Sequence, residues 1–170
     1  MRYNGTISSD SVISYKNSGS VNAPYNESSQ ADWDNIERQI NFGLGLFAEP
    51  IHGSGNYPEV VQKEVPKEWL PELTAEDQKR LSGSADFFAT DYYSSSVSKH
   101  LNETTNGQCI GNNTHPSWPN CAESSYTLSN GWALGEQFPD MTCAAWLTST
   151  SAMLTRHLDY IGKRWPTRKG

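Results

Sequence analysis

The order of helical and extended segments constrains this chain more than any other feature of its sequence. Apolar residues recur at helical spacing and predict an amphipathic helix over residues 32–47, ended by Pro50. An apolar, aromatic run then predicts a buried strand over residues 85–93. A helix that leads into a buried strand is typical of an α/β fold. The apolar stripe of the helix consists of Trp33, Ile36, Ile40, Leu44 and Phe47.

Two capping patterns mark helix starts. Ser29 precedes Asp32 by three residues, and Thr74 precedes Asp77 by the same spacing. The second pattern predicts a short helix that stops at Gly83.

Weaker patterns complete the chain. Residues 12–15 have the composition of a strand, and residues 59–65 could form one helical turn. Between residues 94 and 142 the apolar residues follow neither helical nor strand spacing for long, which predicts a long polar loop. A last helix is predicted over residues 151–165, with an apolar face made of Leu154, His157, Leu158, Ile161 and Trp165.

Length and charge limit the function classes. With 170 residues and no break in composition, the chain is expected to form one domain over residues 1–170. A net charge of -6 works against binding nucleic acid or anionic lipid, which requires clustered Lys and Arg. The only basic cluster, at 163–169, reads as a solvated helix end. No run approaches the roughly 18 apolar residues that span a bilayer. We therefore expect neither nucleic acid nor a membrane as a partner.

Four sequons favour a secreted parent protein, although the first residues lack the apolar stretch of a signal peptide. Each sequon is an Asn followed two residues later by Ser or Thr, and the four are Asn4, Asn26, Asn102 and Asn112.

Three cysteines leave one thiol unpaired under any single disulfide. Pairing of Cys109 with Cys121 is favoured because both lie in the long polar loop, which leaves Cys143 free. The alternative is three unlinked thiols in an intracellular protein.

Three stretches of the sequence have distinctive motifs. The first joins residues 42–51 to a Gly-Asn-Tyr-Pro-Glu turn at 55–59. The second and most specific has Leu-Pro-Glu-Leu-Thr at 70–74, Gly-Ser-Ala-Asp-Phe-Phe at 83–88 and Asp-Tyr-Tyr-Ser-Ser at 91–95. The third has His-Pro-Ser-Trp-Pro at 115–119, Gly-Trp at 131–132, Trp-Leu at 146–147 and His-Leu-Asp-Tyr-Ile at 157–161. Together these stretches resemble family 1 of the glycoside hydrolases, especially its fungal β-glucosidases.

The resemblance implies an α/β fold that is a loop-rich part of a TIM (β/α)8 barrel, at about its fifth and sixth βα units. Active residues of such barrels lie at the carboxyl ends of strands. By similarity, Tyr93 would hydrogen-bond and orient the nucleophilic glutamate, and Trp146 would line the site of the leaving group. The alternative for both side chains is ordinary core packing.

The resemblance implies no cofactor, and no metal site is expected. His52 and His115 lie in Gly- and Pro-containing loops without a partner at metal-ligand spacing, so they read as ordinary polar loop residues.

The chain departs from the family at the catalytic motifs. The family places its acid/base in Asn-Glu-Pro and its nucleophile in Glu-Asn-Gly or Glu-Phe-Gly, and this sequence has neither. Ala48-Glu49-Pro50 lacks the Asn and follows a helix, so Glu49 is not expected to act in catalysis. Other departures are Ala89-Thr90 for the usual Gly and aliphatic residue, Asp91 for Asn, and Ser151 and Met153 for Pro and Gly.

We therefore expect a β-glucosidase-like chain, truncated relative to its parent and inactive alone, whose parent acts on a β-glucoside or oligosaccharide. The first alternative is a non-catalytic carbohydrate-binding protein that uses some of the six tryptophans. The second is a secreted glycoprotein completed by a partner that supplies the remaining barrel segments.

Overall fold

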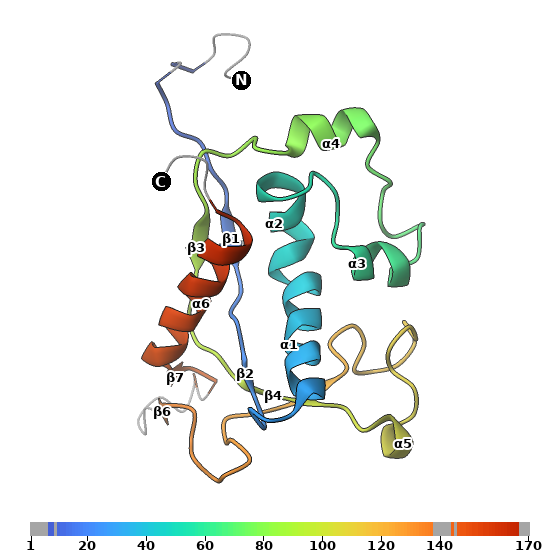
Figure 1. Ribbon diagram of the computed structural model, residues 1–170, viewed down its shortest axis with the longest axis vertical. Coiled ribbons are helices and arrows are strands. Elements are labelled where there is room, and N and C mark those ends of the chain that lie inside the picture. The colour runs from blue at the N-terminus through green and yellow to red at the C-terminus, as the bar shows by residue number, and fades with distance from the viewer. Residues whose placement is uncertain (1–6, 9, 138–143, 145, 167–170) are drawn as a thin grey trace.

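The computed structural model describes residues 7–8, 10–137, 144 and 146–166, whose strands form small open sheets flanked by helices (Figure 1). Strand β1 (Lys16–Ser18) pairs parallel with β3 (Ala89–Asp91). Strand β2 (Ala23–Pro24) pairs parallel with β4 (Val97–His100), which pairs antiparallel with β5 (Ala122–Ser125). Strands β6 (Glu136–Gln137) and β7 (Thr148–Ser149) form a third sheet. Parallel strands joined through helices confirm the α/β class, and the described strands do not close into a barrel.

The first predicted helix is two helices, which corrects the expectation of one helix over 32–47. Helix α1 (Gln30–Phe42) ends at Gly43, and α2 (Leu44–His52) follows at once. Pro50 lies inside α2 and does not end it. The break at Gly43 changes the phase of the apolar stripe, so Phe47 is 61% exposed.

Ser29 caps α1 as its spacing predicted. Its side chain accepts a hydrogen bond from Asp32 N at 3.2 Å. The Asp32 carboxylate does not return to Ser29 but accepts from Asn26 N and His100 N, so it ties the start of α1 to the loop before it and to β4. Only one of the two hydrogen bonds of a capping box is therefore present, and the Asp32 side chain instead stabilises tertiary contacts.

The predicted strand over 85–93 is much shorter in the structure, and so is the one over 12–15. Regular pairing begins only at Lys16 and Ala89. The preceding segments run together irregularly, because Ile13 and Asp86 exchange backbone and carboxylate hydrogen bonds and Ser14 Oγ donates to Phe87 O. The two predicted segments thus lie side by side, and regular β pairing covers only their carboxyl ends.

The stretch from 94 to 142 is not one loop, because it contains β4, β5, β6 and helix α5 (Glu103–Asn106). Strand β4 is hard to recognise from the sequence because one of its fully buried side chains, Ser98, is polar. Ser98 shares hydrogen bonds with Asn35 and Gln39 on α1, so a polar network replaces the apolar contact that a strand pattern requires.

Cys109 and Cys121 are joined by a disulfide with Cα atoms 5.7 Å apart, and both are fully buried. They pack with Leu101 and Trp118 in a small core of their own. Cys143, expected to be free, lies outside the described residues.

The last helix, α6 (Ser151–Arg164), buries only part of the predicted face, because His157, Ile161 and Trp165 are buried as expected and the two leucines are not. Leu154 and Leu158 are 38% and 51% exposed, whereas Met153 is buried together with His157 and Ile161. Val21, Ile161 and Trp165 join residues of α1 and α2 in the main core, which holds the three helices together. Two short helices, α3 (Glu59–Glu64) and α4 (Ala75–Leu81), lie outside it, and α4 has the complete capping box of Thr74 and Asp77.

Arg164, in the basic cluster of residues 163–169, is not simply solvated as expected, and residues 167–169 of that cluster lie outside the described residues. Arg164 hydrogen-bonds Glu37, Asn41 and Tyr160, so it ties α6 to α1. Among the described helices none is both long and apolar enough to cross a membrane.

Candidate functional site

The two side chains expected at a sugar site lie against each other in the structure. Tyr93 follows β3 at its carboxyl end, and Trp146 lies shortly before β7. Their rings meet edge to face with centroids 6.1 Å apart. Tyr93 is 59% exposed and Trp146 56% exposed, so neither is packed into the core. The pair thus presents aromatic surface to solvent beyond the strand end.

The Tyr93 hydroxyl is held by a carboxylate. It donates to Asp91 Oδ2 at 3.2 Å, and Lys16 Nζ binds the same oxygen at 2.5 Å. In the pairing of β1 with β3, Lys16 lies opposite Ala89, two residues before Asp91, and its long side chain reaches the Asp91 carboxylate. Lys16, and then Tyr93, lower the pKa of Asp91 by stabilising its ionised form. Asp91 is therefore a charged, ion-paired group that orients Tyr93.

Tyr92 anchors the strand end from the opposite face. Its hydroxyl lies 2.7 Å from Thr150 Oγ1 and 3.1 Å from Ser95 Oγ. Its ring packs on His157 of α6 with centroids 5.2 Å apart. Because successive side chains of extended backbone point to opposite faces, the half-buried Tyr92 directs Tyr93 outward. Tyr126 donates to Trp146 O at 3.0 Å and fixes the other half of the pair.

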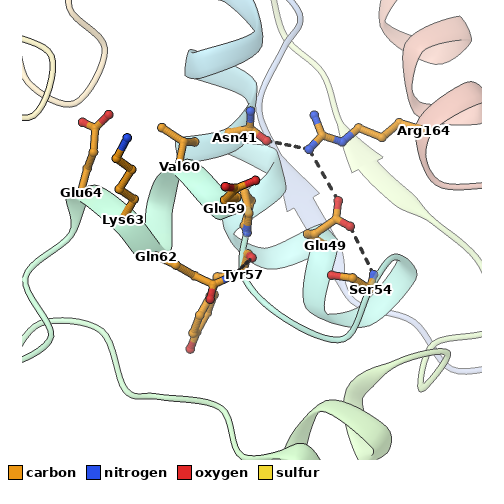
Figure 2. A pocket seen from close by; sticks show the side chains of 11 residues that line it. Asn41, Glu49, Ser54, Tyr57, Glu59, Val60, Gln62, Lys63, Glu64 and Arg164 are labelled. Carbon is orange, nitrogen blue, oxygen red and sulfur yellow. Dashed lines mark hydrogen bonds and ion pairs between the residues drawn. The ribbon is translucent and has the colours of Figure 1, made fainter.

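Glu49 lies elsewhere, in the layer of helices. It accepts hydrogen bonds from Trp165 Nε1 at 3.0 Å and Ser54 N at 3.2 Å, and lies 3.6 Å from Arg164. It lines an open groove of about 770 Å³ between α1, α2, α3 and the end of α6 (Figure 2). A Cβ at position 53 would lie 2.3 Å from Glu49 Oε1, so Gly53 leaves room for this carboxylate. Through these contacts Glu49 links α2 to the end of α6.

The histidines differ from one another. His115 is a loop residue as expected, with Nε2 3.0 Å from Asn106 O and Nδ1 accepting from Ser117 N. His52 lies in α2 and packs between Tyr15 and Phe88, which corrects its placement in a loop. No group of acidic, histidine or cysteine side chains in the described parts of the chain could hold a metal ion.

Three sequons lie within the described residues. Asn26 and Asn102 are exposed, and each side-chain oxygen accepts the backbone N–H two residues later. Asn112 is half-buried and its Nδ2 donates to Gln108 O. Asn4 lies outside the described residues, and glycosylation of all four stays a prediction.

Lys16, Asp91 and Tyr126 were not singled out as parts of a site from the sequence. Asp91 was noted only as a departure from a family motif. Its contact with Lys16 joins residues 75 positions apart. No local pattern carries such a contact, because it depends on the parallel pairing of β1 with β3.

The sequence pattern of glycosyl hydrolase family 1 matches residues 2–165. The chain belongs to this family. The human cytosolic beta-glucosidase is 40% identical over 86 residues, which cover 45% of this chain and 18% of that protein. Raucaffricine-O-beta-D-glucosidase of Rauvolfia serpentina is 37% identical over 84 residues, or 49% of this chain and 15% of that protein.

Solved structures of family 1 enzymes share the fold. Beta-glucosidase 2 of Trichoderma reesei superposes with a TM-score of 0.76 at 24% identity, over 97% of this chain and 33% of that one. Aphid myrosinase superposes with a TM-score of 0.70 at 23% identity, over 96% and 34%. The family 1 chain thus has the fold of part of a glycosidase (β/α)8 barrel, and it spans about a third of these structures.

Proposed function

We propose that this family 1 chain supplies part of the sugar-binding face of a β-glucosidase-type glycoside hydrolase, and that alone it does not hydrolyse β-glucosides. The observation that carries the proposal is the exposed contact of Tyr93 with Trp146 beyond the carboxyl end of β3. Aromatic faces stack on sugar and aryl rings, and barrel enzymes place their active residues at this end of the strands.

The absence of turnover follows from the chemistry. Retaining hydrolysis needs two carboxyl groups about 5 to 5.5 Å apart, one as nucleophile and one as acid. Asp91, the carboxylate in contact with Tyr93, is bound by Lys16. None of the eleven glutamates stands in either family motif. Tyr93 can orient a nucleophile but cannot replace it, because a neutral phenol attacks poorly.

We expect no release of the aryl group from an aryl β-glucoside above the buffer rate, and the same result for Glu49→Gln. Chain purified free of host glycosidase is the material to assay. Turnover abolished by Tyr93→Phe or Glu49→Gln would overturn this part of the proposal.

We expect weak binding of the same glucoside, followed by quenching of tryptophan fluorescence. Trp146→Ala should weaken binding at least about fivefold, since loss of one stacked ring costs about 1 kcal/mol or more. Trp69→Ala is the matched control, because Trp69 is 60% exposed but packs on Trp118. Equal binding by Trp146→Ala and the intact chain would count against the site.

Two alternatives predict binding without turnover, a non-catalytic sugar-binding protein and a chain completed by a partner. Joining the chain to barrel segments that carry both glutamates distinguishes them. Turnover gained on joining favours the completed enzyme, and binding that stays unproductive favours the non-catalytic protein.

A further inference from the structure

Two histidines from different helices pack on the strand pair that presents Tyr93. His52, at the end of α2, stacks on Tyr15 with centroids 5.9 Å apart and lies 4.9 Å from the ring of Phe88. These two rings precede β1 and β3, so His52 contacts the amino ends of both strands.

His157 backs the other end of the same pair. It is fully buried, with Nε2 2.8 Å from the Thr90 hydroxyl in β3 and its ring packed on Tyr92 just after β3. The contact between α6 and β3 at this point is therefore polar. The strand end that carries Tyr93 is therefore held by an ionisable side chain.

Each ring has one enclosed nitrogen without a hydrogen-bond partner in the described residues, Nε2 of His52 and Nδ1 of His157. A protonated ring carries an N–H donor on both nitrogens and a positive charge. At these two positions the extra donor would face no acceptor, and the charge would be enclosed. Burial accordingly lowers the pKa of both histidines.

The titratable rings that face the histidines are Tyr15 and Tyr92, whose hydroxyls are bound to Phe47 O and to Thr150. The charged groups on α1, α2, α6, β1 and β3 are already engaged. The carboxylate of Asp86 accepts from Ile13 N. The other engaged groups are Lys16 with Asp91, Glu27 with Arg156, Asp159 with Lys163, and Glu37 and Glu49 with Arg164.

We propose that His52 and His157 are positioning residues that hold β1 and β3, and with them Tyr93, against the helices only while both rings are neutral. Mild acid then releases the strand pair. Tyr92 loses its support on α6, and the adjacent Tyr93 loses its fixed contact with Trp146. The assignment rests on the proposed function only for the role of Tyr93.

The direction of the pH effect follows from the lowered pKa values. In the unfolded chain a histidine takes up a proton near pH 6.5, whereas in the folded chain it does so only at lower pH. The stability that depends on the neutral rings is complete above about pH 6.5 and decreases as the pH falls below it. Between pH 7.5 and 5.5 each such histidine raises the unfolding equilibrium constant by up to about tenfold, and the two together by up to about 100-fold.

Urea unfolding of the full chain at pH 7.5 and 5.5, followed by tryptophan fluorescence, tests this. The key variant is His52→Phe with His157→Gln, because Phe keeps a ring between Tyr15 and Phe88 and Gln keeps a hydrogen-bonding group for Thr90. We expect a rise of at least about tenfold in the unfolding constant of the intact chain and less than about threefold in the double variant. His100→Gln, a half-buried histidine on β4, is the control and should keep the rise of the intact chain.

A second measurement needs no variant to fold. In NMR spectra of the intact chain, the imidazole signals of His52 and His157 should show no protonation from pH 7.5 down to the pH at which the contacts of β1 and β3 with the helices are lost. Titration of both rings near pH 6.5 in the folded chain would overturn the proposal, as would an equal rise in the double variant. Neither experiment uses a sugar, so absence of glucoside binding would leave this inference standing.

Discussion

At the scale of single residues, Arg38 and Glu64 form a buried ion pair between α1 and α3 that no local sequence pattern indicates. The two side chains are 7% and 8% exposed and form a bidentate ion pair with distances of 2.7 and 2.6 Å. Arg38 also donates to Pro119 O, and Glu64 accepts from Gly111 N, so the pair holds the disulfide loop against α1 and α3.

Arg38→Ala should therefore lower the free energy of unfolding by about 3–5 kcal/mol, because it leaves a buried carboxylate without its partner. Arg38 holds the pKa of Glu64 below its usual value, so this stabilisation is present above about pH 4.5 and is lost as the pH falls. Urea unfolding at pH 7 measures the loss. Arg38→Met with Glu64→Leu is the control and should recover much of it, whereas an equal loss in both variants would contradict the argument.

At the scale of elements, the disulfide of Cys109 with Cys121 closes a loop that has little secondary structure of its own. Polar contacts dock the loop on α1, including Asn35 Nδ2 to Cys121 O at 3.1 Å. Cross-linking removes entropy from the unfolded chain, and for a loop of this size it contributes about 2–4 kcal/mol.

Cys109→Ser with Cys121→Ser should lower stability by that amount and speed hydrogen exchange in residues 101–121 more than in α1. Exchange followed by mass spectrometry, with the single variant Cys143→Ser as control, measures the effect. Uniform acceleration in α1 and the loop would show that the disulfide supports the whole fold instead of this element.

At the scale of the whole molecule, the described strands leave edges open and α6 leaves apolar surface uncovered. Strand β1 pairs with β3 on one side only, and Leu154 and Leu158 are exposed on α6. Open edges and apolar patches promote association.

We therefore expect concentration-dependent self-association of the isolated chain in sedimentation velocity, with a broad thermal transition. Leu154→Lys with Leu158→Lys should reduce the association, whereas Lys substitutions at Thr155 and Asp159, next to them on the helix, should not. A sharp, reversible melt of a monomer would show that the exposed edges and patches are stable in water.

Residue patterns alone predicted the α/β class and most helix positions, because these depend on local spacing, and the family resemblance was carried by short motifs. The capping box of Thr74 and Asp77 involves only residues three positions apart, so a short stretch of sequence is enough to predict it. The favoured pairing of Cys109 with Cys121 rested on a similarly local argument. The expected single domain stays a prediction.

Tertiary structure decided what depends on contacts between distant segments. The break at Gly43 turned Phe47 outward, Leu154 and Leu158 proved exposed, and Ser98 was buried by a hydrogen-bond network that no apolar pattern signals. For the site, the sequence singled out Tyr93 and Trp146 separately. Their contact, the ion pair of Lys16 with Asp91, and the bond of His157 to Thr90 arise only when β1 and β3 pair and α6 packs on them, because each joins residues more than 50 positions apart.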